Sequence, residues 1–233
     1  MFFYVAEPSS GSSMTREEVS MFITLEGIEG SGKTTQITAI KKYLEAAGHG
    51  VVVTREPGAT AIGQRIRSIV LDPENHDISP LCELLLYGAD RAQHLAQVVV
   101  PALDAGKIVL CDRFADATRV YQGVARGLDM ALIDAIHGMV VGPLTPDLTI
   151  LFDLEPETGL SRTFKALENG QRESQESRFE KEALAFHAAV RSGYLALAQK
   201  EKQRFFVVDA SLQPDEVFIQ IKQGLATCLG IHI

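Results

Sequence analysis

Residues 21–35 read MFITLEGIEGSGKTT and decide how the rest of the chain is interpreted. The first six form an apolar run, rich in the aromatic and β-branched residues typical of a strand. Residues 27–34 match the pattern G-x-x-x-x-G-K-[ST] without a mismatch, and a helical pattern follows them. Glycines let such a loop curl so that its N–H groups point at phosphate oxygens, and the helix behind it adds the partial positive charge of its N-terminus. The sequence therefore predicts a phosphate-binding loop between a strand and a helix.

Two side chains of this loop have a predicted chemical role. Lys33 supplies a full positive charge for the β- and γ-phosphates of a nucleotide, and the Thr34 hydroxyl is a ligand for Mg²⁺. A GTPase switch is excluded, because neither Asn75 nor Asn169 is followed by Lys and the chain contains no D-x-x-G stretch. We expect ATP to bind through Gly27, Ile28, Glu29, Gly30, Ser31, Gly32, Lys33, Thr34 and Thr35.

Short apolar runs alternate with helical patterns along the rest of the chain, and this alternation predicts an α/β fold. The fold class we expect is a five-stranded parallel sheet covered by helices on both faces. In such a sheet, ligands bind beyond the carboxyl ends of the strands. After the first strand, the predicted strands are 51–54, 108–111, 148–152 and 204–208, and the predicted helices are about 32–47, 62–71, 80–103, 179–199 and 214–229.

Charged residues follow two of the later strands at the point where each ends. Asp112 and Arg113 come directly after the third strand, and Arg55 comes after the second, with Arg67 and Arg91 on the helices beyond it. A carboxylate in the position of Asp112 commonly holds Mg²⁺ beside a phosphate-binding loop, and an arginine fork grips phosphate in two places. A structural Asp–Arg ion pair is the alternative interpretation of this dipeptide. An arginine cluster in an acidic protein favours phosphoryl transfer between two nucleotides over simple ATP hydrolysis.

Composition limits the partners and the compartment. Among 233 residues, 22 are basic and 30 acidic, and the net charge of −8 argues against non-specific binding to nucleic acid or an anionic membrane. No apolar run reaches the ~18 residues of a membrane span. Three well-separated cysteines suggest reduced thiols and a cytoplasmic protein. Residues 1–20 are interpreted as a flexible N-terminal extension, with the true start open between Met1, Met14 and Met21, and residues 21–233 as one domain.

Taken together, several stretches resemble the thymidylate kinases of the bacterial type. They are FITLEGIEGSGKTT (22–35), TREPGAT (54–60), LLLYGADRAQHL (84–95), GKIVLCDRF (106–114) and YQGVARG (121–127). The glycine-rich loop alone is shared by many families, whereas the combination is far more specific. The resemblance implies the nucleoside-monophosphate-kinase variety of P-loop fold, transfer of the ATP γ-phosphate to dTMP to give dTDP and ADP, Mg²⁺ as cofactor and a homodimer.

The same resemblance implies a binding site for dTMP. Tyr87 would stack on thymine, Arg91, Thr118 and Gln122 would approach the base, and Tyr121 would lie against the deoxyribose. Arg67 and Arg113 would hold the acceptor phosphate, with Glu29 close to these arginines and the sugar. The residues that the resemblance assigns to dTMP binding are Arg67, Tyr87, Arg91, Arg113, Thr118, Tyr121 and Gln122.

Members of the bacterial type also carry a catalytic arginine in a mobile lid. Here the lid would be the polar stretch at about 162–178, where Arg172 is preferred and Arg162 and Arg178 stay open. The predicted catalytic residues are then Lys33, Arg113, Glu29 and Arg172, the predicted metal ligands are Thr34 and Asp112, and the loop at 209–211 is the expected place for adenine contacts. Two alternatives remain at this stage: a kinase for another nucleoside monophosphate, and a protein that binds ATP and a partner without turnover.

Overall fold

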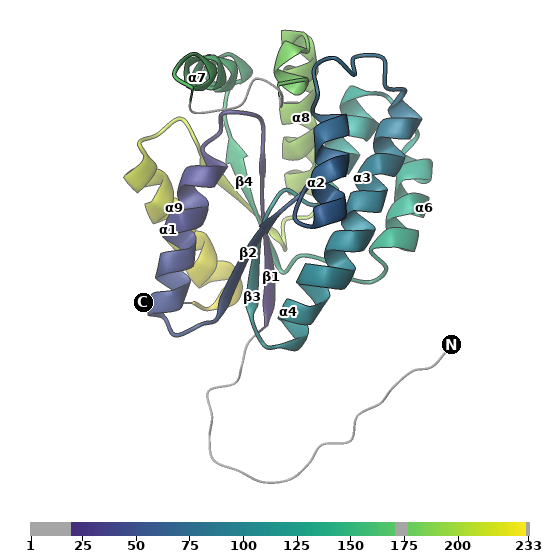
Figure 1. Cartoon of the computed structure of the whole chain (residues 1–233). Coiled ribbons are helices and arrows are strands. Elements are labelled where there is room, and N and C mark those ends of the chain that lie inside the picture. Colours follow the sequence, from purple (N-terminus) through teal and green to yellow (C-terminus); the bar gives the residue numbers. More distant parts are fainter. Residues whose placement is uncertain (1–19, 171–176, 232–233) are drawn as a thin grey trace, which may run out of the picture.

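A computed structural model describes residues 20–170 and 177–231. Within this part of the chain, five parallel strands form one sheet in the order β2-β3-β1-β4-β5, which confirms the predicted fold class (Figure 1). Each observed strand overlaps its predicted range with ends shifted by one residue at most. The strands are β1 (Met21–Gly27), β2 (Val51–Arg55), β3 (Ile108–Asp112), β4 (Leu148–Asp153) and β5 (Phe205–Asp209).

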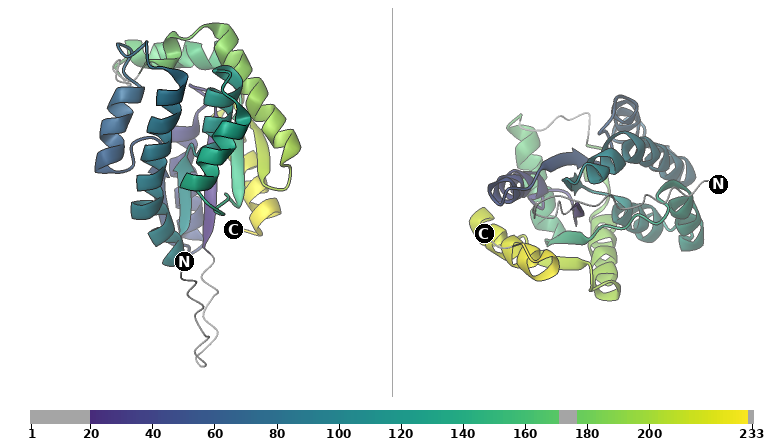
Figure 2. Two further views of the ribbon diagram at one scale, coloured as in Figure 1. Left: turned by 90° about the vertical axis from the view of Figure 1, so that its right-hand side faces the viewer. Right: turned by 90° about the horizontal axis from the view of Figure 1, so that it is seen from below.

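Helices cover both faces of the sheet, as the apolar strands require. In Figures 1 and 2, α1 and α9 lie on one side of the sheet, and α2, α3, α4 and α6 lie on the other. The central strand β1 is therefore buried on both faces, and its Phe22, Ile23 and Leu25 are at most 1% exposed. The α-helices are α1 (Lys33–Ala46), α2 (Ala61–Val70), α3 (Pro80–His94), α4 (Val100–Asp104), α5 (Ala115–Thr118), α6 (Met130–Val140), α7 (Pro156–Glu168), α8 (Leu184–Lys200) and α9 (Pro214–Leu229).

The helix predicted at 80–103 is continuous but changes its winding in the middle. A π-helical segment η1 (Leu95–Val99) joins α3 to α4, just before Pro101. Proline lacks an N–H and cannot enter the regular α-helical hydrogen-bond ladder, so a wider turn at this point keeps the helix unbroken. A second π-helical segment, η2 (Arg119–Ala125), follows α5, and a short 3₁₀ turn η4 (Phe179–Lys181) precedes α8.

Three observed α-helices, α5, α6 and α7, were not predicted. Residues 162–168 belong to α7, so the described beginning of the predicted lid is helical and not a solvated loop. The helix begins with Pro156, which favours the first helical position. Its buried face carries small residues, Gly159 and Thr163, whereas the large apolar residues at helical spacing, Leu160, Phe164 and Leu167, are only partly buried or exposed. Residues 171–176, and with them Arg172, lie outside the described residues, as do residues 1–19 of the predicted N-terminal extension.

The structure also bears on the expectations about membrane spans and cysteines. No helix in the described segments is both long enough and apolar enough to cross a membrane. Cys82, Cys111 and Cys228 are all free thiols, with Cys111 buried at the end of β3.

Candidate active site

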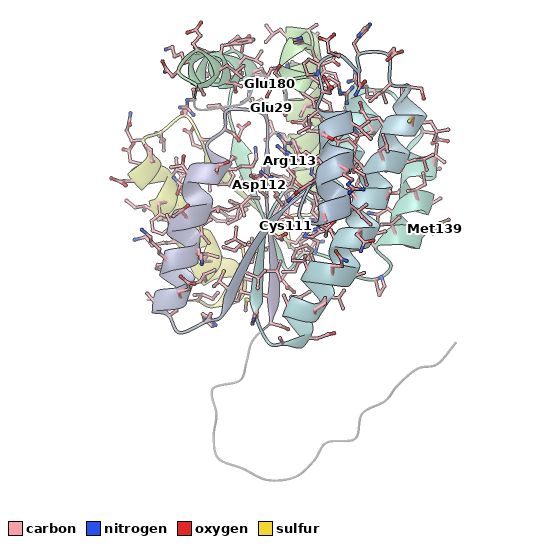
Figure 3. All side chains as sticks on the ribbon, viewed as in Figure 1. Glu29, Cys111, Asp112, Arg113, Met139 and Glu180 are labelled. Atoms are coloured by element: carbon pink, nitrogen blue, oxygen red, sulfur yellow. The ribbon has the colours of Figure 1, made fainter. Side chains whose placement is uncertain are left out.

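A cavity of about 1020 Å³ opens at the carboxyl ends of β1, β2 and β3. Figure 3 shows Glu29, Asp112 and Arg113 near this end of the sheet, whereas Met139 lies at the outer surface on α6. The cavity brings together most of the residues that the sequence singled out. They are Glu29, Gly30, Ser31, Gly32, Lys33, Thr34, Thr35, Arg67, Tyr87, Arg91, Asp112, Arg113, Thr118, Tyr121 and Gln122.

The glycine-rich loop at 27–32 holds its own lysine in place. Nζ of Lys33 donates to the carbonyl oxygens of Gly27 and Ile28, both at 2.9 Å, and to Oγ of Ser31 at 3.1 Å. Gly27 and Ile28 do not line the cavity, but their carbonyl oxygens hold the Lys33 side chain in place. Burial and the nearby charge of Arg113 lower the pKa of Lys33 to about 8.

The outer side of this loop rests directly on helix α7. A Cβ built on Gly159 would lie 2.4 Å from the carbonyl oxygen of Glu29, and one built on Gly30 would lie 2.1 Å from the carbonyl oxygen of Gly159. Real Cβ atoms do not approach that closely, so both positions require glycine as long as the two backbones stay in contact. Gly30 also has a φ of +71°, a left-handed conformation that favours glycine.

Arg113 lies at the centre of a buried hydrogen-bond network. Its Nη2 donates to Oε1 of Glu29 at 2.9 Å, and its Nη1 donates to the Tyr121 hydroxyl at 2.9 Å and to the Tyr194 hydroxyl at 3.4 Å. The Tyr121 hydroxyl donates in turn to Oε1 of Glu29 at 2.7 Å. Arg113 has a φ of +69°, which is strained for a residue with a side chain, and this network holds it there.

The pKa values of the two buried glutamates around Arg113, Glu26 and Glu29, are shifted in opposite directions. Burial alone would raise the pKa of Glu29, but the charge of Arg113, the nearby His187 and the hydrogen bond from Tyr121 outweigh it, so that this pKa lies well below its ordinary value. Burial, together with the negative charge of Asp116, raises the pKa of Glu26 to about 7. Glu29 is therefore a permanent anion facing the cavity.

Arg91 is fixed by the segment that follows β2. Its Nε donates to Oε2 of Glu56 at 2.7 Å, and its Nη2 donates to the Thr118 hydroxyl at 3.1 Å and to the carbonyl oxygen of Phe114 at 3.2 Å. The other carboxylate oxygen of Glu56 lies 2.8 Å from Nδ1 of His94. The side chains of Arg91, Glu56 and His94 are at most 5% exposed, so the Arg91 guanidinium is held rigidly at the cavity wall.

Arg67, Tyr87 and Gln122 lie along another part of the cavity wall. Nη1 of Arg67 donates to the carbonyl oxygen of Pro57 at 3.0 Å. Nε2 of Gln122 donates to Oε1 of Glu83 at 2.7 Å. Burial and the adjacent carboxylate of Glu83 raise the pKa of Tyr87, so its ring stays neutral at physiological pH.

Thr34 and Asp112 are suited to Mg²⁺. Both line the cavity, and Oδ1 of Asp112 is buried without a hydrogen-bond partner in the described part of the chain. Hydroxyl and carboxylate oxygens are the donors that Mg²⁺ prefers, and this ion is commonly bound by one or two protein oxygens together with substrate phosphates. The described residues contain no group of three or more His, Cys, Asp or Glu side chains that could hold a metal without such help.

The three lid candidates lie in different surroundings. Arg162 lines the cavity, and its Nη1 donates to the carbonyl oxygen of Ala210 at 3.0 Å, within the loop expected to contact adenine. Arg178 does not line the cavity: its Nε donates to the carbonyl oxygen of Val70 at 2.6 Å, and its Nη2 pairs with Glu83. Arg172 lies outside the described residues.

Sequence reasoning missed the carboxylates and the α8 side chains that support this site. Glu83 precedes Tyr87 by four residues and Arg91 by eight, and this helical spacing is a signal for one shared face. Glu56 directly follows β2, as Asp112 ends β3, and could have been found in the same way. Tyr194 carries no local signal, because only the fold brings α8 to this edge of the sheet.

The sequence model of the thymidylate kinase family matches residues 25–221, which include the entire cavity lining. The chain belongs to the thymidylate kinase family. A thymidylate kinase from Desulforapulum autotrophicum is 63% identical over 213 residues, covering 91% of this chain and 94% of that protein. One from Desulfosudis oleivorans is 57% identical over 190 residues, covering 82% of this chain and 89% of that protein.

A solved structure supports the fold assignment independently. The thymidylate kinase of Ehrlichia chaffeensis is 31% identical and superposes with a TM-score of 0.70, covering 89% of this chain and 99% of that one. As a thymidylate kinase, the chain is a nucleoside monophosphate kinase that phosphorylates dTMP to dTDP at the expense of ATP. The family membership confirms the reaction that the resemblance implied.

Proposed function

We propose that this chain transfers the γ-phosphate of ATP directly to dTMP within the single cavity described above. The observation that carries this proposal is that the phosphate-binding loop and three arginines, Arg67, Arg91 and Arg113, line the same cavity of about 1020 Å³. The volume lies at the upper end of the range of about 300–1000 Å³ that is typical of small-ligand pockets.

On the donor side, the backbone N–H groups of residues 27–35 and Nζ of Lys33 bind the ATP phosphates. Thr34 and Asp112 would hold Mg²⁺, which supplies charge neutralisation at the phosphates when bound. Lys33 must exchange its contacts with Gly27 and Ile28 for phosphate oxygens. Arg162 and the carbonyl of Ala210 lie where the adenine end of ATP is expected.

On the acceptor side, Arg67 and Arg113 hold the phosphate of dTMP and Tyr87 stacks on thymine. A planar ring offers a base a stacking face worth about 1–3 kcal/mol, by analogy with nucleic-acid-binding proteins. The fixed guanidinium of Arg91 donates to the base, and its Glu56 partner prevents it from turning away. Thr118 and Gln122 approach the base edge, and Tyr121 lies against the deoxyribose.

The transfer requires alignment and charge neutralisation more than acid–base chemistry. An oxygen of the dTMP phosphate is already anionic at neutral pH and attacks the γ-phosphorus in line, so no general base is needed. Glu29, kept ionised by its lowered pKa, acts by orienting Arg113 toward the reacting phosphates. A lid arginine would add positive charge to the transition state, and Arg172 remains the proposed residue.

We also propose a cytoplasmic homodimer. Exposed apolar side chains gather on two helices that pack on each other, namely Ile62 and Ile69 on α2 and Leu81 and Leu85 on α3. Sedimentation equilibrium should give twice the mass of one chain, and Leu85→Glu should shift the protein toward monomer. A wild-type protein that sediments as a monomer would contradict this part of the proposal.

An acceptor panel tests the main proposal. ADP formation from ATP is measured with dTMP, dUMP, UMP, CMP and AMP under identical conditions, and dTMP should be the preferred acceptor. Preference for AMP or CMP would assign the chain to another nucleoside monophosphate kinase. ATP binding without any acceptor-dependent ADP formation would instead support a binding protein without turnover.

A further inference from the structure

Glu83 on α3 is a buried carboxylate to which the expected roles assign no function. Its side chain is 1% exposed and meets three partners from two later parts of the chain. Nε2 of Gln122 donates to Oε1 at 2.7 Å, Nε of Arg126 lies 3.5 Å from the same oxygen, and Nη2 of Arg178 pairs with Oε2. Buried charges in proteins are normally paired, and this carboxylate pairs with two arginines and also accepts a hydrogen bond from a neutral amide.

The carboxylate fixes which end of the Gln122 amide points toward it. An ionised carboxylate only accepts hydrogen bonds, so Gln122 must present its NH₂ group to Glu83. The amide oxygen is then the group that Gln122 can offer to a ligand in the cavity that it lines. Without such a partner, a glutamine side chain could turn either end toward the ligand.

We propose that Glu83 is a positioning residue that makes this kinase select a base with a hydrogen on N3. Thymine and uracil carry N3–H, a donor that the Gln122 amide oxygen accepts. Cytosine has an unprotonated N3, an acceptor that the same oxygen repels. The inference rests on the proposed contact between Gln122 and the base.

Arg178 explains why this position needs a carboxylate. Arg178 is itself fixed, because its Nε donates to the carbonyl oxygen of Val70 at 2.6 Å and its backbone N–H to that of Leu71 at 3.2 Å. A guanidinium only donates. Arg178 makes a hydrogen bond to Glu83 and lies closer to it than Arg126 does, so in Glu83→Gln the new amide turns its oxygen toward Arg178 and its NH₂ toward Gln122. Gln122 would then rotate and present its own NH₂ to the base.

The experiment compares kcat/KM for dTMP, dCMP and dUMP in the wild type, Glu83→Gln, Gln122→Ala and the double variant. Glu83→Gln should lower the ratio of dTMP to dCMP by about tenfold or more, because sites built around a hydrogen bond discriminate strongly against the wrong partner. The ratio of dTMP to dUMP should stay within about twofold, since both bases carry N3–H. Ratios measured on one preparation do not depend on the fraction of folded enzyme.

The double variant separates positioning from a general structural role. If Glu83 acts through Gln122, adding Glu83→Gln to Gln122→Ala should leave the dTMP to dCMP ratio unchanged. A Glu83→Gln enzyme that retains the wild-type ratio, or an equal further loss in the double variant, would overturn the inference. If Glu83→Gln does not fold, Glu83→Asp takes its place, because it keeps the charge beside Arg178 but withdraws the carboxylate from Gln122. Glu83→Asp should also lower the dTMP to dCMP ratio. An unchanged ratio in Glu83→Asp would overturn the inference.

If the assignment of Gln122 to the base is wrong, the variants should give a different pattern of dTMP to dCMP ratios. If Gln122→Ala itself leaves the dTMP to dCMP ratio unchanged, the proposed contact between Gln122 and the base is wrong, whatever Glu83 does. If Gln122→Ala lowers the ratio and Glu83→Gln does not, the contact stands and the positioning role of Glu83 is refuted.

Discussion

Nη2 of Arg113 lies 2.9 Å from Oε1 of Glu29, and this ion pair joins the phosphate-binding loop to the segment that follows β3. The pair lies in the cavity wall, with the Glu29 side chain 8% exposed and that of Arg113 20% exposed. One contact therefore links the part of the site expected to bind ATP with the part expected to bind the acceptor phosphate. We therefore expect substitutions of Arg113 to affect both binding functions and the stability of the protein.

Arg113→Met should abolish phosphorylation of dTMP and destabilise the protein by about 3–5 kcal/mol, because it leaves the buried Glu29 carboxylate without its cation. Urea unfolding and dTMP-dependent ADP formation measure the two effects. Adding Glu29→Gln removes the unpaired charge, so the double variant should recover most of the stability and none of the activity. A double variant as unstable as Arg113→Met would show that the ion pair is not the cause, and an active Arg113→Met would contradict the proposed role of Arg113.

Gly159→Ala should weaken ATP binding by at least tenfold, although Gly159 lies in a helix and does not line the cavity. The new Cβ would lie 2.4 Å from the Glu29 carbonyl oxygen, so either α7 or the phosphate-binding loop must move. Titration calorimetry with ATP measures the affinity. Gly138→Ala in α6 is the matched control, since a Cβ there meets nothing within 4 Å and the change should slightly stabilise the helix. Wild-type ATP affinity in Gly159→Ala would mean that the loop tolerates the displacement.

Asp90→Asn should stabilise the protein at alkaline pH. Oδ1 of Asp90 accepts a hydrogen bond from the Gly58 N–H at 3.0 Å, whereas Oδ2 is buried without a partner in the described residues. Burial, followed by the charge of Glu56, raises the pKa of Asp90 from 3.8 to about 6. Protonation therefore favours the folded state, and this contribution is complete below about pH 4 and lost as the pH rises through 6.

The asparagine variant keeps the acceptor for Gly58 and cannot ionise. Its free energy of unfolding should exceed that of the wild type by about 1 kcal/mol at pH 8, and the difference should shrink toward pH 4. Denaturant unfolding of both proteins between pH 4 and pH 8 checks this trend, with Asp104→Asn, at an exposed position on α4, as the control. A difference that does not vary with pH would remove the ionisation of Asp90 as its cause.

Replacement of Tyr87 should separate stacking from the hydroxyl group. Tyr87→Leu should raise KM for dTMP by about tenfold, because the base loses a planar partner, while KM for ATP stays unchanged. Tyr87→Phe keeps the ring and should behave like the wild type. Equal KM values for dTMP in the leucine and phenylalanine variants would mean that Tyr87 does not stack on the base.

The sequence was sufficient for the sheet and for the phosphate-binding loop because both depend on local patterns. The central strand β1 is apolar almost throughout, and the loop that follows it has a fixed spacing of glycine, lysine and threonine. The position of Asp112 and Arg113 was also predictable, since the carboxyl ends of parallel strands meet at one edge. These features required no knowledge of distant contacts.

The supporting contacts could not be predicted, because they join residues that are far apart in the chain. Tyr194 donates to Glu26 at 2.6 Å across 168 positions of sequence. Arg178 had the charge expected of a lid arginine, but the pattern did not show that a buried glutamate on α3 pairs with it. Helix α7 was missed for a related reason: its small inner residues are explained only by the loop against which they pack.

From the close contact between Gly30 and Gly159 we expect an order of events during protein synthesis. The ribosome releases the nucleotide-binding motif early, but the helix that braces it, and the strand β4 that pairs with β1, emerge much later. A nascent chain that ends before α7 carries the complete motif and lacks the surface that gives it its final shape. We therefore expect the growing polypeptide to bind nucleotide only after α7 has been synthesised. A truncated translation product should not compete for cellular ATP.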